Sequence, residues 1–487
     1  MKLKRFLGIA LGAILLLALV LAYNTWSRPS RQIEVAPAPV VAVNAEAVAT
    51  HLADALKCAT VTGLPETAAT DKEFARLREH LRVSFPRVHA ALAPEIIGGR
   101  SLLYTWQGTD PSLRPIMILA HMDVVPIAPG SEGDWQHPPF AGVIADGFIW
   151  GRGAWDDKAN LVASLEAAEL LLAEGFRPKR TVYIASGADE ELGGAQGALR
   201  IAERLRERGV RLEYLLDEGL IITQGVFPKL DPPLALIGVA EKGYVSVTLR
   251  TEGTPGHASM PPAQTPIGIM STALARLEER PLPASLSGTV REMLEVVGPE
   301  MHGIDRIALT NLWLFKPLLV ARLQKQPSTN AMLRTTTAAT MFHAGNKENV
   351  LPSEVAATVN FRLVPGDSIA GVLEHVRTTI ADDRIKLATT PIRAEPSKVS
   401  RTDVPAYAAL ERSIRQVFPE AIVAPGLMIG ATDARHFAEV VDNVYRFSPM
   451  RARPEDLARF HGTNERIAVA NFVEMIRFYR QLILNSM

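Results

Sequence analysis

A short apolar run that ends in a histidine constrains this chain more than any other feature. Residues 116–120 are Ile-Met-Ile-Leu-Ala, and a proline precedes them. A continuous apolar run of this length predicts a strand buried on both faces of a parallel sheet rather than a helix. His121 ends the run, and Asp123 follows two residues later on the same side of the strand direction. An imidazole with a carboxylate able to orient it is a candidate metal ligand at the carboxyl end of a strand.

The composition suits a globular chain of two or more domains. The chain has 487 residues, of which 47% are hydrophobic and 21% are charged. Its 52 basic residues balance 52 acidic ones, so the charge gives no support for a nucleic-acid partner. Cys58 is the only cysteine, which excludes an internal disulfide and a cysteine-rich zinc site. Any metal is therefore expected to be held by His, Asp and Glu.

The amino-terminal residues 1–27 predict export, as a signal anchor or as a signal peptide. Basic residues precede an uncharged run at 6–23 that is just long enough to cross a bilayer, which favours a cytoplasmic amino end. Residues 20–22 are a passable cleavage signature, but the length of the run and Trp26 favour a retained anchor. The body is expected outside the cytoplasm, and it would be secreted or periplasmic after cleavage. Residues 28–44, with three prolines, are expected to form an extended linker.

From residue 45 onward, helical and strand-like patterns alternate. This alternation predicts an α/β class, with a doubly wound sheet of parallel strand order at residues 45–241 and 395–487. Between them, residues 242–394 show a β-α-β-β-α-β order, which is typical of a ferredoxin-like sandwich, with residues 281–330 as an insertion in it. The expected helices span residues 48–59, 70–83, 161–174, 195–208, 266–279, 369–381, 405–417 and 469–484, and the expected strands span residues 102–107, 116–120, 143–150, 181–185, 214–216, 234–239, 245–250, 332–342, 355–364, 385–391, 421–425 and 443–447.

Acidic residues follow several of the predicted strands. The carboxyl ends of strands in open α/β sheets meet at one edge, which is where such sheets place their sites. Two carboxylates at a glycine-rich turn would repel phosphate but suit a cation, and of two adjacent glutamates one can bind metal while the other acts as a base. Each pair alone is more simply a helix cap, but capping does not explain acidic residues after successive strands. The candidates are Asp156 and Asp157, then Asp189, Glu190 and Glu191, then Asp217 and Glu218.

These motifs together resemble the dizinc aminoacylase and carboxypeptidase family of metallopeptidases, over nearly all of residues 45–485. Within that family, the chain is most similar to the branches of the secreted N-fatty-acyl-amino-acid synthase/hydrolase and of carboxypeptidase S. The motifs that carry the resemblance are His121-Met-Asp123, Gly151-Arg-Gly-Ala-x-Asp156, Asp189-Glu-Glu191, Asp217-Glu-Gly219 and His461-Gly-Thr-Asn-Glu465. Stretches shared with those branches include Asn311-Leu-Trp-Leu-Phe315, Thr329-Asn-Ala331, Arg334-Thr-Thr-Thr-Ala338, Gly430-Ala-Thr-Asp-Ala-Arg435 and Tyr445-Arg-Phe447.

The resemblance implies a zinc-exopeptidase-like catalytic domain that binds two zinc ions per chain. Two ions held close together lower the pKa of a bridging water, so that hydroxide forms at ordinary pH. A cis peptide bond between Asp156 and Asp157 is also implied. In the implied arrangement Asp156 bridges the ions, His121 and either Asp217 or Glu218 complete one site, and Glu191 and His461 complete the other.

The resemblance also assigns residues to the reaction and to the substrate. Glu190 would be the general base, and Asp123 would orient His121. His257 would stabilise the oxyanion, often from the partner subunit, so residues 242–394 would be a lid through which a homodimer forms. Asn349 and Arg362 would grip the carboxylate of the substrate. Arg362 lies in an otherwise apolar predicted strand, where an unpaired guanidinium is costly, so a carboxylate partner is expected.

The implied activity is zinc-dependent cleavage of the amide bond of N-acyl, including N-fatty-acyl, amino acids, and this reaction is reversible in the family. The alternative is a carboxypeptidase or dipeptidase that releases a carboxyl-terminal amino acid from short peptides. Trp313, Phe315 and residues 318–320 either line an acyl groove or form the core of the lid. A non-catalytic receptor is disfavoured because every candidate ligand and the base are present. A two-metal phosphoesterase is disfavoured because Arg362 is the only cation found for a phosphate.

Overall fold

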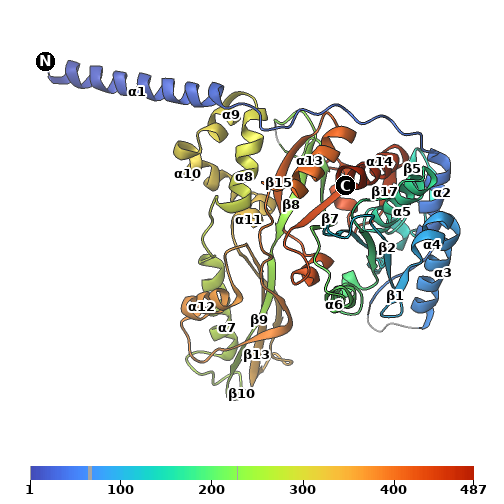
Figure 1. Cartoon of the computed structure of the whole chain (residues 1–487). Helices are drawn as coiled ribbons and strands as arrows, with labels where there is room; N and C mark the ends of the chain where they lie inside the picture. The colour runs from blue at the N-terminus through green and yellow to red at the C-terminus, as the bar shows by residue number, and fades with distance from the viewer. Residues whose placement is uncertain (1, 64–67, 228) are drawn as a thin grey trace.

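The computed structural model describes residues 2–63, 68–227 and 229–487, and an eight-stranded sheet runs through these residues (Figure 1). The prediction of a doubly buried strand at 116–120 is confirmed, because every residue of this strand is buried and its neighbours on both sides run parallel to it. The order of strands is β1 (Glu95–Ile97), β2 (Ser101–Trp106), β6 (Val182–Gly187), β3 (Ile116–His121), β7 (Tyr214–Thr223), β16 (Val444–Ala452), β8 (Leu234–Glu241) and β15 (Ile422–Met428).

Helices cover both faces of this sheet, which confirms the predicted doubly wound class. Alternate residues of β3 pack on opposite sides: Ile116 and Ile118 join one core, whereas Met117 and Leu119 join the other. The helices that cover the first face include α2 (Ala45–Leu56), α3 (Ala68–Ser84), α4 (Pro86–Leu92), α5 (Lys158–Ala173), α13 (Pro405–Val417) and α14 (Val469–Asn485), and α6 (Ala198–Glu207) covers the second.

The expectation of parallel order throughout the sheet was wrong at its edges. β2 pairs antiparallel with both β1 and β6, and β16 pairs antiparallel with β8. β1 and β2 are joined by a short turn in which Gly98 and Gly99 both have positive φ, and strands joined so tightly must run antiparallel. The sheet is therefore mixed: β6, β3, β7 and β16 run parallel at its centre, and β8 and β15 pair parallel with each other at one edge but run opposite to the central strands.

Residues 143–150 are a hairpin rather than one strand of the main sheet. β4 (Val143–Ala145) and β5 (Phe148–Trp150) are joined by Asp146 and Gly147, which both have positive φ. An Asp-Gly pair favours such a two-residue turn, so the sequence carried the signal that the single-strand prediction overlooked. β17 (Arg466–Ala468) pairs with β5 and completes a separate three-stranded sheet.

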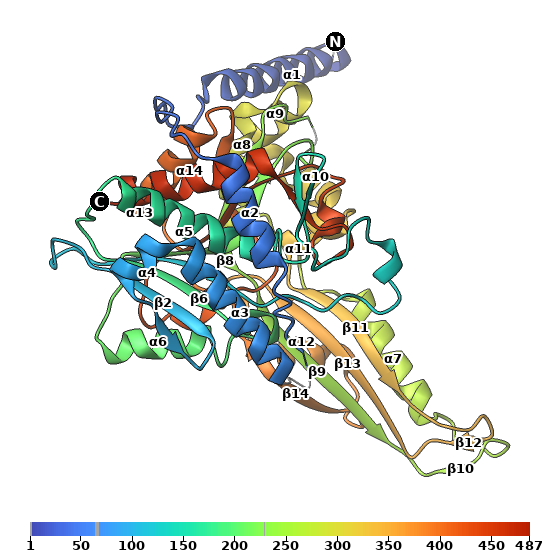
Figure 2. The same ribbon diagram turned by 90° about the vertical axis from the view of Figure 1, so that its right-hand side faces the viewer.

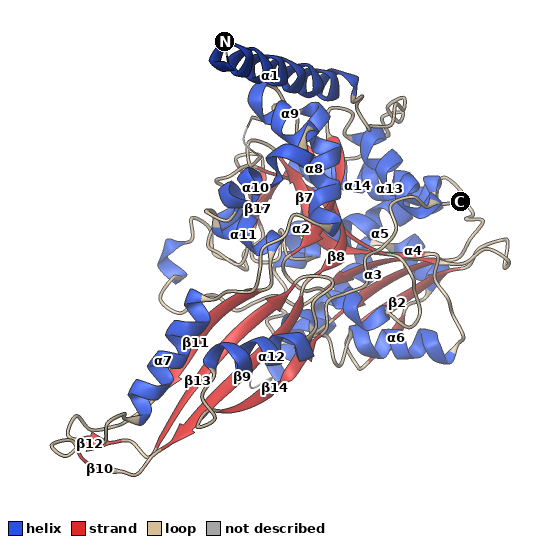
Figure 3. Cartoon of the chain, turned by 90° about the vertical axis from the view of Figure 1, so that its left-hand side faces the viewer, coloured by secondary structure: helices blue, strands red, loops and turns tan. Residues whose placement is uncertain are grey.

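The predicted ferredoxin-like order is present in a second, antiparallel sheet with the strand order β11-β13-β9-β14. Two helices pack on one face of this sheet around a core of their own. A small pairing of β10 with β12 forms its far tip (Figures 2 and 3). The elements are β9 (Gly243–Glu252), β10 (Gly256–His257), α7 (Pro266–Glu279), β11 (Thr336–His343), β12 (Val350–Leu351), β13 (Glu354–Leu363), α12 (Ile369–Ile380) and β14 (Lys386–Ala394). The use of residues 242–394 as a hinged lid stays a prediction.

The insertion at 281–330 is helical, which the sequence patterns did not predict. Its helices pack against the outer strand β15 of the main sheet, in a core that includes Ile422 and Leu427, and not against the four-stranded sheet. The tip of the four-stranded sheet is therefore left uncovered by the insertion (Figure 2). The helices of this region are α8 (Gly288–Val297), α9 (Gly303–Thr310), α10 (Leu312–Leu323) and α11 (Pro327–Leu333).

The amino-terminal helix α1 (Lys2–Ser27) projects away from the body (Figure 1). Within the described residues, α1 is the one helix long and apolar enough to cross a membrane. Residues 28–44 contain no helix or strand, but they are not a free tether. Gln32 exchanges hydrogen bonds of 2.9 and 2.7 Å with the backbone of Val423, and the Ala38 N–H donates to Gln416 O at 2.9 Å. The expected linker is thus fixed along the body.

Candidate active site

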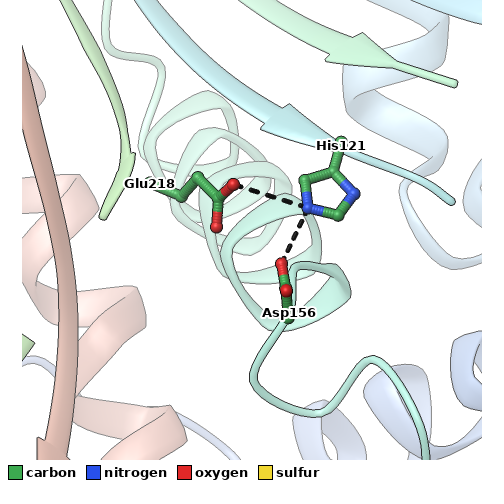
Figure 4. Close-up of side chains that lie close together, drawn as sticks. All are labelled: His121, Asp156 and Glu218. Atoms are coloured by element: carbon green, nitrogen blue, oxygen red, sulfur yellow. Dashed lines mark hydrogen bonds and ion pairs between the residues drawn. The ribbon is translucent and has the colours of Figure 1, made fainter. Parts of the chain in front are cut away.

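The first group of candidate metal ligands consists of His121, Asp156 and Glu218 (Figure 4). His121 ends β3, Glu218 lies in the adjacent parallel strand β7, and Asp156 lies in the loop that leads into α5. His121 Nε2 lies 2.8 Å from Asp156 Oδ1 and 3.6 Å from Glu218 Oε1. The side chain of His121 is only 1% exposed. The neighbouring strands thus bring together three side chains that are distant in the sequence.

The second group consists of Asp156, Glu191 and His461. His461 Nε2 lies 2.6 Å from the other carboxylate oxygen of Asp156, Oδ2, and 3.6 Å from Glu191 Oε1. Asp156 therefore presents one oxygen to each histidine, which is the arrangement that a carboxylate shared by two cations requires. The His461 side chain is 43% exposed, so this second group is far more open to solvent than the first.

The donor atoms of both groups fit a cation. In each group the nitrogen and oxygen atoms lie within 4.8 Å of one another, and imidazole with carboxylate is a ligand set that zinc takes. Glu191 Oε1 is buried and has no hydrogen-bond partner among the described residues. Burial and the charges of Asp156 and Asp157 raise the pKa of Glu218 well above its usual range. A bound cation would remove the cost of holding these carboxylates together.

Asp217 and Glu218, which the sequence left as alternatives, have different surroundings. Adjacent residues of a strand point to opposite sides, and only Glu218 lies in a group with His121 and Asp156. Asp217 is 2% exposed, and its carboxylate accepts hydrogen bonds from the Glu218 N–H at 3.0 Å and the Ala434 N–H at 2.8 Å. We therefore propose Glu218 as the ligand, while Asp217 holds the loop that begins at Gly430.

The loop that carries Asp156 is held by a buried carboxylate from near the end of the chain. Glu465 Oε1 accepts hydrogen bonds from the backbone N–H groups of Gly153, Trp155 and Asp156, at 3.0, 2.7 and 3.2 Å. Its second oxygen lies 2.7 Å from Arg152 Nη1. The peptide bond between Asp156 and the next residue is cis, as the resemblance implied. Glu465 thus fixes the backbone from which the shared candidate ligand projects.

Asp123 connects the histidine of the first group with the two glutamates. His121 Nδ1 lies 3.0 Å from the backbone oxygen of Asp123 and 3.4 Å from its carboxylate. The same carboxylate accepts hydrogen bonds from the N–H groups of Glu190 and Glu191, both at 3.1 Å, and from the hydroxyl of Thr62 at 2.8 Å. Asp123 is therefore placed to position the glutamate pair as well as to orient His121.

Glu190 lies beside the two candidate metal groups without belonging to either. Burial, together with the charges of Asp156 and Glu191, raises the pKa of Glu190 to about 8. Its carboxylate lies 4.0 Å from Arg435 Nη2. A carboxyl group with a pKa near neutrality is suited to accept and return a proton.

Arg362 lies in β13, half-buried, with its guanidinium 4.6 Å from the ring centre of Tyr244. It forms no ion pair within the described part of the chain. Burial lowers the pKa of Arg362, and the positive charge of Arg435 lowers it further. Burial and Arg362 also lower the pKa of Lys242 to about 8. Arg362 therefore lacks an anionic partner among the described residues, whereas the Lys242 ammonium donates to the backbone oxygens of Ala331 and Arg334.

The structure places His257 and Asn349 far from the other candidate residues of the same chain. Both are exposed at the tip formed by β10 and β12, where the Ala258 N–H donates to Asn349 O at 3.0 Å. The stretch of β13 from Glu354, near the tip, to Arg362 spans about 26 Å at the usual rise of a strand. The expected pairing of Asn349 with Arg362 is therefore absent within one chain.

The part of the sequence that carries the candidate site matches a protein-family model. Residues 117–485 match the model described as peptidase family M20/M25/M40. The chain belongs to this family. Its M20 peptidases are metal dependent, so the chain is a metal-dependent hydrolase of amide or peptide bonds, and the resemblance inferred from the motifs is confirmed.

The relatives of the chain within the M20 family are named either as N-fatty-acyl-amino acid synthase/hydrolases or as carboxypeptidase S proteins. The chain is 43% identical to the N-fatty-acyl-amino acid synthase/hydrolase of Mus musculus, over 90% of this chain and 88% of that protein. It is also 43% identical to a probable carboxypeptidase S-like protein of Dictyostelium discoideum, over 85% of this chain and 80% of the relative. Carboxypeptidase S of Saccharomyces cerevisiae is 30% identical over 85% of this chain and 79% of its own length.

Solved structures confirm the M20 fold. The M20 metallo-carboxypeptidase of Sulfolobus solfataricus gives a TM-score of 0.65 with 18% identity, and it covers 90% of this chain and 99% of its own. Human carnosine dipeptidase 1 gives a TM-score of 0.61 with 16% identity, and it covers 91% of this chain and 96% of its own. At these identities the likeness concerns the fold alone.

Sequence reasoning missed several contributors to this M20 site. Thr62 gave no recognisable signal, and Arg435 was visible only as the last residue of a shared stretch, because their contacts depend on loops that meet only in the folded chain. Glu465 was visible only as the last letter of a motif. Arg362 is not the only cation in its surroundings, since Lys242 and Arg435 lie close to it. The number of cations therefore does not disfavour a phosphoesterase, but membership of a peptidase family does.

Proposed function

We propose that this chain is a dizinc amidohydrolase that cleaves N-acyl amino acids, with N-fatty-acyl amino acids preferred, and that α1 holds it at a membrane with its body outside the cytoplasm. The observation that carries the proposal is the division of the two Asp156 oxygens between two histidines, close to Glu190, whose side chain is 11% exposed. A single-cation site would not need this shared carboxylate.

The proposed ligands are His121, Asp156 and Glu218 for one zinc ion, and Asp156, Glu191 and His461 for the other. When bound, the two ions would lower the pKa of a water molecule and polarise the amide carbonyl. Glu190 takes a proton from the attacking water and later donates it to the nitrogen of the leaving amine. The raised pKa of Glu190 supports this role, because a base that must also act as an acid works best with a pKa near the working pH.

Arg362 supports an amino acid as the leaving group. A guanidinium that is half-buried, stacked on Tyr244 and without an ion pair in the described chain suits a free α-carboxylate. The charge of Arg435 acts on both Arg362 and Glu190, so the three residues lie in one region of the molecule. The carboxylate and the scissile amide of one amino acid would therefore bind in this region.

The preference for a long acyl chain is supported by the relatives named N-fatty-acyl-amino acid synthase/hydrolase. The same names support a reaction that also runs toward condensation. The alternative, a carboxypeptidase acting on short peptides, is supported by the similarity to carboxypeptidase S. In both cases the bond cleaved is an amide to an amino acid with a free carboxylate.

We also propose that residues 242–394 dimerise and deliver His257 and Asn349 to the cleft of a second subunit. Both residues share the exposed tip of the four-stranded sheet, which lies too far from the candidate ligands of its own chain to act there. In this arrangement His257 donates a hydrogen bond to the oxygen that becomes negatively charged in the transition state.

The test compares three substrates with the full chain after zinc loading: an N-long-chain-acyl amino acid, its carboxamide, and the corresponding N-acetyl amino acid. We expect the acid to be cleaved at least about 100-fold faster than the carboxamide, because the carboxamide leaves Arg362 unpaired. Equal rates for acid and carboxamide would contradict the role of Arg362. Faster cleavage of the acetyl compound would reject the lipid preference but would leave the amidohydrolase reaction itself in place.

A further inference from the structure

The outward face of helix α10 is apolar, which is unusual for a helix exposed to water. None of its residues is buried, although most are apolar. Leu312, Leu319, Val320 and Leu323 pack partly against the core beside β15. The opposite face is formed by Leu314, Pro317, Leu318 and Ala321, at the i, i+3, i+4 and i+7 spacing of one helical face, with Trp313 at its edge, and all five are exposed. A surface helix normally presents polar residues on that side.

This apolar face is joined to the helix that could cross a membrane. α1 packs against α9, and α9 packs against α10 (Figure 1). The Asn24 side chain of α1 donates to Asn311 Oδ1 at 2.9 Å, and the Trp313 indole donates to the same oxygen at 3.2 Å. The hydroxyls of Thr25 and Thr310 lie 3.2 Å apart. The start of α10 therefore lies at the level of the last turns of α1.

Exposed aromatic residues lie where the last turns of α1 meet the start of α10, as they do at a membrane boundary. Tyr23 and Trp26, near the end of α1, are 71% and 80% exposed. Trp313 is 59% exposed, and it is tied to α1 through Asn311. Tyr and Trp gather where a bilayer meets water, because their rings are apolar and their N–H or O–H groups are polar. Three exposed Tyr and Trp side chains therefore lie near the place where the end of α1 meets the start of α10.

The body has little freedom to turn this face away from the membrane. The segment after α1 is held to the main sheet by the two hydrogen bonds between Gln32 and Val423, and again at Ala38. Arg306 of α9 donates to the backbone oxygen of Thr25 at 3.3 Å. Wherever α1 enters a bilayer, α9 and α10 are therefore brought to its surface.

We propose that the outer face of α10, with the neighbouring Ile304 of α9, is seated in the headgroup region of the bilayer that α1 spans. Ile304 is 74% exposed and Leu318 is 65% exposed. Arg322 of α10 is exposed beside the apolar face, one turn after Leu318, which suits a helix lying among phospholipid headgroups. The inference rests on the retained anchor proposed above and is independent of the reaction that the chain catalyses.

Lipid is the occupant that the surroundings of this face favour over a second copy of the chain. The proposed dimer uses the four-stranded sheet, whereas α10 packs in the core beside β15 of the main sheet. In Figure 2, α10 lies far from the tip formed by β10 and β12. A bilayer already present around α1 covers the face without a further partner. A lipidic substrate dissolved in that bilayer would then meet the protein at α10, without first crossing water.

The first experiment measures contact with lipid and needs no activity. The single native cysteine, Cys58, is buried, so a cysteine introduced at an exposed position can be labelled selectively. Leu318→Cys, and Ile392→Cys on β14 as a control that is also exposed, are labelled with bimane in the full chain. Both proteins are reconstituted in vesicles of phosphatidylcholine and phosphatidylglycerol. Fluorescence is then quenched either by nitroxide-labelled lipid or by iodide in the water.

We expect lipid-borne nitroxide to quench the label at position 318 at least about twofold more than the label at position 392, and iodide to show the reverse order. Equal quenching at the two positions by both reagents would overturn the proposal. Loss of α1 by cleavage, seen by mass spectrometry of the reconstituted protein together with iodide access at position 318, would overturn it as well.

A second pair of variants separates this inference from the proposed reaction. Trp313→Ser with Leu318→Ser is compared with Val83→Ser with Ile96→Ser, which removes exposed apolar residues from α3 and β1, away from the proposed dimer surface. We expect the first pair alone to lower cleavage of a long-chain substrate dissolved in vesicles, by about 10-fold, and to leave cleavage of a water-soluble acetyl substrate unchanged. Lipid quenching without cleavage of acyl amino acids would reject the reaction but keep the docking. Equal effects of both pairs would reject the role of docking in substrate entry.

Discussion

The two ends of the proposed cleft are built in opposite ways. At the main sheet, His121 and Asp123 are buried, and Asp123 and Glu465 hold the backbone around the candidate ligands. At the tip of the four-stranded sheet, His257 is exposed on a strand of two residues, and its Nδ1 contacts only the neighbouring Ser259 within the described structure. The first region is organised by its own chain, whereas the second has to obtain its surroundings from another molecule.

The largest effect is expected at the organised end. Glu190→Gln should lower turnover by roughly 10²–10⁴-fold, which is the usual contribution of a positioned general base to the rate. Zinc content should stay near that of the wild type. Zinc is measured by mass spectrometry of the metal, and turnover with an N-acyl amino acid. Glu455→Gln, a change of the same kind at an exposed glutamate, serves as the control and should be silent. Full activity of Glu190→Gln would remove this residue from the mechanism.

Loss of His257 at the exposed end should lower turnover nearly as much, although His257 is expected to act in the active site of the other subunit. His257→Ala should lower turnover by about 10²–10³-fold through loss of an oxyanion donor, and His343→Ala, at another exposed histidine, should not. Mixing His257→Ala with Glu190→Gln protein should restore about a quarter of wild-type activity, because half of the random dimers then contain one intact site. No recovery, with subunit exchange demonstrated by differently tagged chains, would show that the two regions do not meet across a dimer.

A smaller effect is expected where a residue supports the site without touching the substrate. Asp123→Asn keeps the shape of the side chain but weakens its hydrogen bonds to the backbone of Glu190 and Glu191. We expect a loss of about 10–100-fold in zinc affinity or in turnover. Competition with a fluorescent chelator measures the affinity. If affinity and turnover both equal those of the wild type, the organisation of this end does not depend on Asp123.

The smallest effect concerns the pH dependence of metal binding. A hydrogen bond to Asp156 and the nearby carboxylate of Glu191 raise the pKa of His461 to about 10 in the absence of metal, so this ring is protonated at pH 7. A metal ligand must be neutral, so binding releases that proton, and apparent affinity should rise about 10-fold per pH unit between pH 6 and 8. Chelator competition across this range tests the sign. Affinity that is independent of pH would contradict the role of His461 as a ligand.

The sequence alone predicted those features that depend on local pattern. The run before His121 was apolar on both faces, so its position at the centre of a sheet followed from its residues. The β-α-β-β-α-β order followed in the same way from alternating short runs and helical spacing. The acidic motifs were found because each comes where a predicted strand ends, and parallel strands bring such ends together.

Other features depend on contacts between distant segments, and the sequence did not contain them in readable form. Whether Asp217 or Glu218 faces His121 is decided by the register of β7 against its neighbours. The antiparallel pairing of β16 with β8 joins strands more than 200 residues apart. The position of His257 was predictable only as a turn, since its neighbours in a working enzyme would belong to another chain.

The bond between Glu465 and the Asp156 loop also has a consequence for the order of events during biosynthesis. A ribosome makes the chain from its amino end, so the strand that ends in His121 emerges early, whereas positions 461 and 465 come near the close of a 487-residue chain. A chain that has been made only as far as residue 460 lacks one histidine of the second group and the carboxylate that fixes the Asp156 loop. The second candidate group can therefore form only after residue 461 has been made, whereas the residues of the first group are all present much earlier.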